Sequence, residues 1–482
     1  MQSKRDQVQA HLFVMSRLAT GMLRGEPDAP DTPVGRTSRG TVIGMILGAL
    51  IALGVTLYGV VVPGGATGWR KPGTLVMVDE TGARFLYLNG ALHPVPNETS
   101  AKLLAGDQMA VDQVSESSLA GTPRGAPIGI VGAPDSLPTP ADLVNSPWLS
   151  CAVVQPTATG GAAPQLTLAV GPAQEGTRLA GDQGLLIVAP DNTQYLLWHG
   201  QRLRLDTKGG AVQALGYAAA TPYPVTAAFL DTLAAGPDLA APAVDGQGSA
   251  GPQLAGQPSR IGQLFTGPRG DHYLLTATGL VPLGGTAFAL LSGDPQTQRI
   301  AYAGAAVQPA AIGPDDLAAH GAPAADAARW AAPGLPDQPP TLVTPGQGQA
   351  VCADVQASAG APVTAVSVLD AAAIGGQPPA VQPGVQPSCT AADRIAVRPG
   401  GGALVRALSG AGTGATVYLV SDGGVKYPLA SAAVVKQLGY GASVPAAVPE
   451  GLLALLPSGP SLDPALLAGG GVVVPPAAKV GC

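Results

Sequence analysis

The seven lysines of the chain are the residues on which phosphate chemistry would depend. A P-loop requires Gly-Lys followed by Ser or Thr, because the lysine must reach the β- and γ-phosphates. No lysine in the sequence follows a glycine. Gly246-Gln247-Gly248-Ser249-Ala250-Gly251 fits G-x-G-x-x-G, but it lies in a proline-bounded linker, without a strand before it or a helix after it. The sequence therefore predicts no nucleotide site.

Histidine and cysteine, the usual catalytic and metal-binding side chains, are few and scattered. The five histidines stand singly in the sequence, and neither H-E-x-x-H nor G-x-S-x-G occurs. The four cysteines include no C-x-x-C pair, which excludes a zinc ribbon and a thioredoxin-type redox pair. We therefore expect a protein that is not an enzyme and that holds no metal and no cofactor.

The charge balance argues against a nucleic-acid partner. The 482 residues carry a net charge of −6 at pH 7, and only 12% of them are charged. Neutralising phosphates needs clustered Lys and Arg, which this composition does not supply. Because 46% of the residues are apolar, the chain can form packed cores, although 67 glycines and 48 prolines indicate many loops.

One long apolar segment lies near the start of the chain. Thr41–Val62 contains no charged residue, and as a helix it would rise about 33 Å, enough to cross a hydrocarbon core of about 30 Å. A cleaved signal peptide is the alternative, but its apolar region is usually about 7–15 residues long and follows a short basic start. We therefore expect an uncleaved transmembrane helix over residues 40–63.

Charge and cysteine placement both predict how this helix is oriented. Arg24, Arg36 and Arg39 precede the span, whereas Arg70 and Lys71 follow it, which slightly favours a cytoplasmic N-terminus. All four cysteines follow the span, as expected if that part enters an oxidising compartment where disulfides persist: Cys151, Cys352, Cys389 and Cys482. The prediction is a single-pass protein of the cell membrane with an extracytoplasmic C-terminal region.

The segment before the span begins with an amphipathic pattern. Its apolar residues recur at spacings of three and four, which is typical of one face of a helix: Val8, Leu12, Met15, Ala19 and Met22. Gly25 and Pro27 should end this helix, and Asp28–Arg39 should be a linker. The helix could lie on the membrane surface or bind a cytosolic partner; its thin basic face favours a partner, contacted through Val8, Leu12, Met15 and Met22.

Four segments after the span share one pattern, consisting of a β-hairpin with an aromatic first strand, a glycine-containing turn and then a short helix. The hairpins are predicted over Arg84–Val95, Gln194–Leu205, His272–Leu283 and Val417–Leu429, and the helices over Ser100–Gly106, Ala211–Gly216, Thr286–Leu291 and Ala432–Gly439. One hairpin with one helix buries little surface, so each unit must pack on a neighbour or on a shared core.

Two stretches interrupt these units, and their alternating apolar residues predict a β-rich core. They are Arg124–Gly181 and Gln338–Gly412, and they contain the alternating segments Gln165–Val170, Ala350–Val355 and Ala403–Leu408. The fold class is therefore α+β, with an N-terminal amphipathic helix, one transmembrane helix and four hairpin-helix repeat domains around a central core.

Several motifs occur in a characteristic order and spacing along nearly the whole chain: Ser3–Val14, Gly82–Val95, Ser100–Leu104, Ser146-Pro147-Trp148 before Cys151, and Val397–Gly400. With these motifs the chain resembles EccB, the single-pass B component of actinobacterial type VII (ESX) secretion systems.

This resemblance carries implications for partners and cysteines. It implies assembly with EccC-, EccD- and EccE-like membrane subunits and a mycosin protease, and self-association of the extracytoplasmic domain. It also implies a disulfide between Cys151, which follows Ser-Pro-Trp, and Cys352 in the second core half. The states of Cys389 and Cys482 stay open, and pairing of Cys352 with the nearer Cys389 is the alternative.

The expected function is that of a structural, membrane-anchored subunit of a type VII protein secretion complex. The alternative is a single-pass envelope sensor or anti-sigma-like regulator whose repeats bind the cell wall. The expected parts are a cytoplasmic helix and linker, the span, repeat 1, the first core half, repeats 2 and 3, the second core half, and repeat 4 with the tail. Their boundaries are 1–39, 40–63, 64–123, 124–181, 182–250, 251–337, 338–412 and 413–482.

Overall fold

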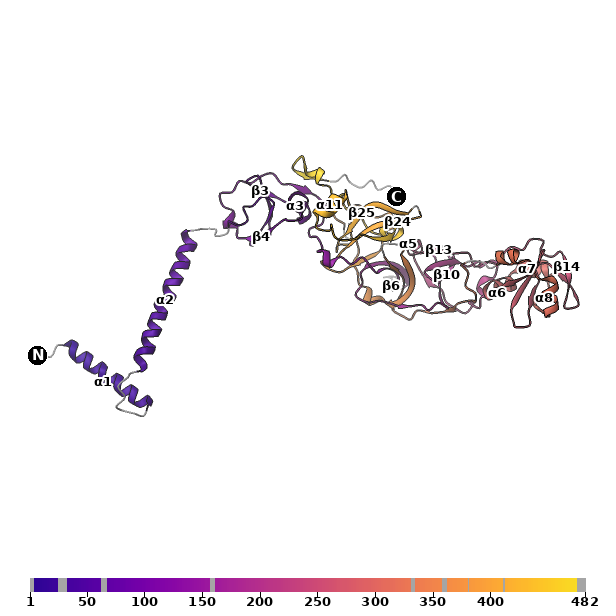
Figure 1. The fold of residues 1–482 in the computed structure, drawn as a ribbon, viewed down its shortest axis with the longest axis horizontal. Helices are drawn as coiled ribbons and strands as arrows, with labels where there is room; N and C mark the ends of the chain where they lie inside the picture. Colours follow the sequence, from indigo (N-terminus) through magenta and orange to yellow (C-terminus); the bar gives the residue numbers. More distant parts are fainter. Residues whose placement is uncertain are drawn as a thin grey trace. The chain divides into compact units, whose positions relative to one another are not determined.

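The computed structural model describes residues 4–24, 33–61, 67–156, 161–330, 334–357, 362–379, 381–410 and 412–474. Helices and strands are mixed along the chain (Figure 1). The chain divides into two compact units, one formed by Met1–Leu92 with Ala110–Arg124 and the other by His93–Met109 with Gly125–Cys482. The units are described separately below.

The first unit begins with two long helices, α1 (Lys4–Arg24) and α2 (Pro33–Val61), drawn in indigo in Figure 1. The segment Thr37–Tyr58 of α2 is long and apolar enough to cross a membrane, and none of it is buried by the rest of the chain. The predicted linker is partly helical, since α2 begins at Pro33. Proline is favourable in the first turn of a helix because its missing N–H has no partner there anyway.

The first unit also contains a small sheet with the strand order β3-β2-β1-β4. Its strands are β1 (Thr74–Val78), β2 (Arg84–Leu88), β3 (Ala91–Pro94) and β4 (Val111–Val114). Strand β1 pairs antiparallel with β2 and parallel with β4. Asn89 and Gly90 form the turn between β2 and β3 with positive φ values of 50° and 79°, which is the backbone that a tight hairpin requires.

Three sheets of the second unit have the same arrangement. Three consecutive strands form an antiparallel meander, and a fourth strand pairs parallel with the first strand of that meander. The second sheet has β9 (Gln183–Val188), β10 (Gln194–Trp198), β11 (Gln201–Arg204) and the parallel β12 (Tyr223–Pro224), with β13 (Ala234–Ala235) and β20 (Thr341–Leu342) at its margins. The third has β16 (Leu264–Thr266), β17 (His272–Thr276), β18 (Gly279–Leu283) and β19 (Ala310–Ala311). The fourth has β24 (Ala403–Ser409), β25 (Gly412–Val420), β26 (Lys426–Leu429) and β27 (Ala446–Pro449).

A short helix follows each hairpin, and these helices pack in pairs. They are α3 (Glu98–Ala105), α4 (Ala211–Ala214), α6 (Gly285–Gly293) and α11 (Ala432–Gln437). Helix α3 contacts α11, and α4 contacts α6. The second pair meets at Gly293, where an added Cβ would lie 2.5 Å from the Ala214 side chain. A glycine is therefore required for this close approach.

A six-stranded sheet with the order β23-β7-β6-β21-β22-β8 combines the two predicted core stretches. The first stretch supplies β6 (Trp148–Pro156), β7 (Ala162–Val170) and β8 (Thr177–Arg178), and the second supplies β21 (Gln349–Gln356), β22 (Val363–Asp370) and β23 (Arg394–Val397). One face buries Trp148, Leu168 and Val351 in a cluster that also contains Phe229 near the second sheet and Val405 from the fourth. The second and fourth small sheets are thus attached to this core by shared apolar side chains.

Strand β24 differs from the sequence-based assignment, which placed Ala403–Leu408 in the core sheet. It pairs with β25 and β27 and belongs to the fourth small sheet, although Ala403 and Val405 still pack into the core cluster. Alternation of apolar and polar residues identifies a strand but does not reveal which sheet it joins. Helix α3 likewise belongs, by its contacts, to the second unit.

The remaining elements are short. Strands β14 (Ala250–Leu254) and β15 (Gln257–Arg260) form a separate hairpin, and β5 (Gly129–Ile130) pairs with β28 (Val472–Val473). The other α-helices are α5 (Ala227–Asp231), α7 (Pro295–Ala301), α8 (Pro314–His320), α9 (Ala324–Trp330), α10 (Ala371–Ile374) and α12 (Glu450–Ala454). Three 3-10 turns span Glu116–Leu119, Pro140–Asp142 and Pro464–Leu467.

Candidate functional site

The glycine-rich segment at Gly246 has the geometry of a packed turn. The main-chain N–H groups of Gln247, Gly248 and Ser249 donate to the carbonyls of Val244, Ile261 and Gly246 at 3.3, 2.9 and 3.1 Å. An added Cβ on Gly248 would lie 2.7 Å from the Ile300 side chain. A phosphate-binding loop presents free N–H groups, whereas these three are already used within the chain. Strand β14, and no helix, follows the turn.

Three histidines near the predicted hairpins make local contacts. His199 stacks on Trp198, and its Nε2 donates to the Gly181 carbonyl at 3.0 Å. His93 donates through Nδ1 to the Ala126 carbonyl at 2.9 Å, and His272 stacks on Phe288. No three His, Cys, Asp or Glu side chains lie close enough to hold a metal ion in the part of the chain that the structure describes.

A disulfide joins Cys151 on β6 to Cys352 on β21, directly opposite each other in the core sheet. The two Cα atoms lie 4.0 Å apart, the residues are separated by 201 positions in sequence, and both are fully buried. The bond therefore ties the two core halves together. Cys389 is also disulfide-bonded, so Cys352 is not its partner, and Cys482 lies outside the described residues.

A buried ion pair lies on the same face of β21 as this disulfide. Asp354, two positions after Cys352, is 1% exposed, and its Oδ2 accepts from Arg178 Nε at 2.9 Å and from a second guanidinium nitrogen at 2.8 Å. Gln356 donates to the other carboxylate oxygen at 2.8 Å. Because a buried carboxylate needs such partners, Arg178 holds the short edge strand β8 onto the core. This pair was not predicted from the sequence, although Asp354 within the apolar segment Ala350–Val355 is a visible signal of a buried carboxylate.

Helix α1 presents its predicted contact residues to solvent. Val8, Leu12, Met15 and Met22 are all more than half exposed, with Met22 at 86%. Phe13, Val14 and Leu18 are exposed as well. The helix therefore carries a large apolar surface that no described part of the chain covers.

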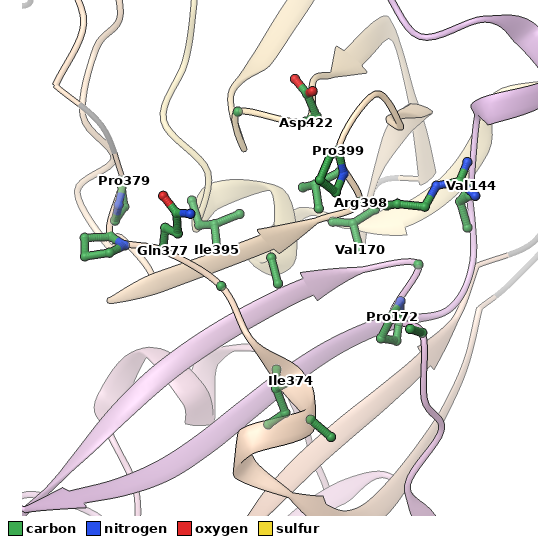
Figure 2. A pocket seen from close by; sticks show the side chains of 18 of the residues that line it. Val144, Val170, Pro172, Ile374, Gln377, Pro379, Ile395, Arg398, Pro399 and Asp422 are labelled. Carbon is green, nitrogen blue, oxygen red and sulfur yellow. The ribbon is translucent and has the colours of Figure 1, made fainter.

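A cavity of about 840 Å³ lies at the edge of the core sheet, beside β23 (Figure 2). Its lining includes Val170, Ile395 and Val397, and four prolines also contribute to it: Pro172, Pro378, Pro379 and Pro399. In Figure 2, Gln377 and Pro379 lie at one end and Val144 and Arg398 at the other. Arg398 binds Asp142 at 3.0 Å, and the Asp422 carboxylate accepts from Gly400 N at 2.9 Å. Arg398 is thus ion-paired within the chain, whereas the exposed Asp422 carboxylate accepts a main-chain hydrogen bond.

Burial perturbs a lysine in the fourth sheet. Lys426 Nζ donates to the carbonyls of Leu453 and Leu456, at the C-terminal end of α12, the second at 3.0 Å. Removal from water lowers the pKa of Lys426 from 10.5 to about 8. Burial similarly raises the pKa of Tyr217 to about 12. Lys426 therefore acts as a helix cap, since cations are favourable at helix C-termini.

The comparison with known proteins identifies the family. Residues 1–472 match the family described as type VII secretion system ESX-1, transport TM domain B. The chain belongs to the EccB family. The resemblance seen in the sequence motifs is thereby confirmed. The ESX-3 secretion system ATPase EccB3 of Mycolicibacterium smegmatis is 30% identical to it, over 95% of this chain and 89% of that protein. The ESX-1 secretion system ATPase EccB1 of Mycobacterium tuberculosis is 27% identical, over 96% and 94%.

Solved structures support the same fold. A chain of an intact ESX-5 inner membrane complex has a TM-score of 0.61 at 23% identity and covers 96% of this EccB chain and 95% of its own length. A chain of the EccB3 dimer from the ESX-3 core complex has a TM-score of 0.61 at 26% identity and covers 81% and 98%. The mixed α+β fold with one apolar N-terminal helix is therefore that of EccB proteins.

Proposed function

We propose that this EccB chain is a structural, membrane-anchored subunit of a type VII protein secretion complex. The observation that carries the proposal is the family match over residues 1–472, in a chain whose apolar helix α2 is not buried by the chain itself. Related chains have been solved inside an ESX-5 inner membrane complex and as an EccB3 dimer. The alternative role as an envelope sensor or anti-sigma-like regulator receives no support from these relatives.

The proposed topology places α1 in the cytoplasm and everything after α2 outside the cell membrane. The cysteines favour this orientation, because the disulfide between Cys151 and Cys352 would persist in an oxidising compartment. The basic residues near α2 favour it weakly. In this proposal the four small sheets, which share one strand arrangement, correspond to four extracytoplasmic repeat domains, and the fourth domain begins at β24 rather than at residue 413.

The proposed role does not include ATP hydrolysis, although relatives carry the word ATPase in their names. Two observations support this. No lysine follows a glycine in the sequence, and the N–H groups of the G-x-G-x-x-G turn are bonded within the chain. In the proposed topology cytosolic ATP would also reach only the residues before α2.

The proposed partners are EccC-, EccD- and EccE-like membrane subunits, a mycosin protease and further copies of this chain. An affinity-tagged chain, extracted from native membranes in a mild detergent, should retain these subunits, and mass spectrometry of the eluate should identify them. Recovery of a transcription factor on the cytosolic side, without membrane subunits, would instead establish the regulator.

A further inference from the structure

Strand β25 begins before its neighbour β26 does. Strand β26 pairs only with Val417–Val420 of β25, so the outer edge of Gly412–Thr416 faces no described strand. All five residues of this segment are exposed. The segment Gly412–Thr416 is called the arm. An exposed strand edge presents unpaired N–H and C=O groups and is a template for pairing with another chain.

The sequence of the arm offers no protection against such pairing. Natural edge strands are usually blunted by lysine, proline or an inward-pointing charge, yet no charged residue and no proline occurs between Arg406 and Asp422. The side chains at 412–416 are Gly, Thr, Gly, Ala and Thr. Gly412 and Gly414 lie on the same face of the strand, because side chains alternate, and that face can approach another surface closely.

The cavity beside β23 offers a matching unpaired edge. Ile395 exchanges two main-chain hydrogen bonds with Gln377, at 2.8 and 3.0 Å, on the side of β23 away from β7. The N–H and C=O groups of successive residues point to opposite sides of a strand. Val397 is two positions after Ile395, so its N–H and C=O point to the same side as those of Ile395, and Val397 lines the cavity. No described strand pairs with Val397 there.

The arm cannot enter the cavity of its own chain. Asp422 and Gly423, in the turn after β25, line the cavity, whereas the arm lies at the other end of β25. The eight steps from Gly412 to Val420 span roughly 26 Å in an extended strand. An arm that reaches this cavity must therefore come from a second copy.

We propose that the arm of one copy adds as a strand beside β23 of a second copy, with the glycine face of Gly412 and Gly414 toward Val170 and Ile395 and with main-chain hydrogen bonds to Val397. The cavity wall beside β23 is apolar, since Val170, Ile395, Val397 and four prolines line it. Arg398 is ion-paired with Asp142, and Asp422 accepts a main-chain hydrogen bond, so an uncharged strand with small side chains fits it. This contact rests on the proposed function, in which copies of the chain assemble in the membrane. Because this contact joins two different surfaces of the chain, successive copies linked by it can close into a ring.

Cysteine cross-linking between two differently tagged full-length copies in native membranes tests the contact. One copy carries Ala415→Cys in the arm and the other carries Gln377→Cys at the cavity. Mild oxidation should give a disulfide-linked species that contains both tags. The matched control replaces Gln377→Cys with Val363→Cys, a position that is 68% exposed on β22, and should give no such species. Adding Gly414→Lys to the arm copy should abolish the cross-link, because position 414 lies on the face that contacts Val170 and Ile395 and the charge would enter an apolar part of the cavity.

Three results would overturn the proposal. If the copies co-purify but the Gln377→Cys pair cross-links no better than the Val363→Cys control, the contact is absent while the proposed function stands. If two Ala415→Cys copies link to each other instead, the arms pair edge to edge and the cavity is not their site. If the tagged copies never co-purify from native membranes, self-association itself fails and the proposal falls with it.

Discussion

Lys426 shows at the scale of a single residue how burial couples charge to stability. Its folded pKa of about 8 lies below the ordinary 10.5, so between these two values the unfolded chain binds more protons than the folded chain. The free energy of unfolding should therefore rise as the pH increases from about 8 to about 10.5, because the cost of burying the charge disappears.

Replacing Lys426→Met should remove this dependence. Relative to the variant, the wild-type protein should gain up to about 3 kcal/mol across that pH range, since each pKa unit corresponds to about 1.4 kcal/mol. Thermal unfolding of the detergent-solubilised protein at pH 7.5, 9 and 10.5 measures the difference. The exposed Lys436→Met serves as the control and should show no such change. A constant offset between wild type and Lys426→Met at all pH values would contradict the prediction.

Features of single residues could be predicted from the sequence where the neighbouring residues alone determine them. Asn89-Gly90 marks a hairpin turn on its own, because only such residues adopt positive φ without strain. The partner of Asp354 could not be found in this way. Arg178 is 176 positions away in sequence, and it reaches Asp354 only because β8 pairs with β22 at the sheet edge.

At the scale of elements, the disulfide between β6 and β21 is the covalent link between the core halves. A closed loop of 201 residues stabilises the fold by up to about 5 kcal/mol in the chain-entropy model. Replacing Cys151→Ala and Cys352→Ala together should lower the unfolding temperature strongly without abolishing the sheet, since β6 and β21 remain paired in register.

Peptide mapping under non-reducing conditions checks the pairing independently. It should recover a peptide that contains Cys151 linked to Cys352 and lose it in the double variant. A peptide that links Cys352 to Cys389 would contradict the assignment, and an unchanged unfolding temperature in the double variant would contradict the energetic estimate.

Helix α1 is the element from which we expect the cytosolic contact. Burying three of its exposed apolar side chains against a partner would contribute roughly 1.5–3 kcal/mol each. Replacing Leu12→Asp and Met15→Asp should therefore release the EccC-, EccD- and EccE-like subunits while the extracytoplasmic domain stays folded. The control Gln7→Asp with Gln9→Asp introduces two carboxylates without removing apolar surface and should retain the partners. Normal recovery of partners with the first variant would make α1 a membrane-surface anchor only.

Element assignment from sequence was accurate for hairpins and weak for their flanking strands. The aromatic-aliphatic strands β2, β10, β17 and β25 carry the pattern that revealed the repeated segments. Flanking strands such as β1 and β4 carry no such aromatic signature. Strand β24 was recognised by its alternation, which did not reveal the sheet that it joins. Very short strands such as β12 and β19 form only because a neighbouring strand supplies their hydrogen-bond partners. That neighbour is fixed by the tertiary fold and cannot be identified from the local sequence.

At the scale of the whole molecule, the sequence predicts an order of repeats and core halves along the chain, but it does not reveal how elements distant in sequence pack on one another. The shared cluster that joins Trp148 to Phe229 and Val405 depends on which faces meet, and the pairing of α4 with α6 depends on a single glycine at 293. Such contacts lie between elements distant in sequence, where periodicity carries no information.

The central claim is that this EccB chain functions as part of a large membrane assembly and not as a separate enzyme or receptor. The most direct measurement is the native size of the untagged protein, extracted from its own membranes in a mild detergent and resolved on a blue-native gel. Nearly all of the protein should migrate in a complex far larger than its 47.5 kDa mass, with several copies and the other membrane subunits present in the same band. Migration of the bulk of the protein as a monomer, with no other membrane subunit in its band, would contradict it.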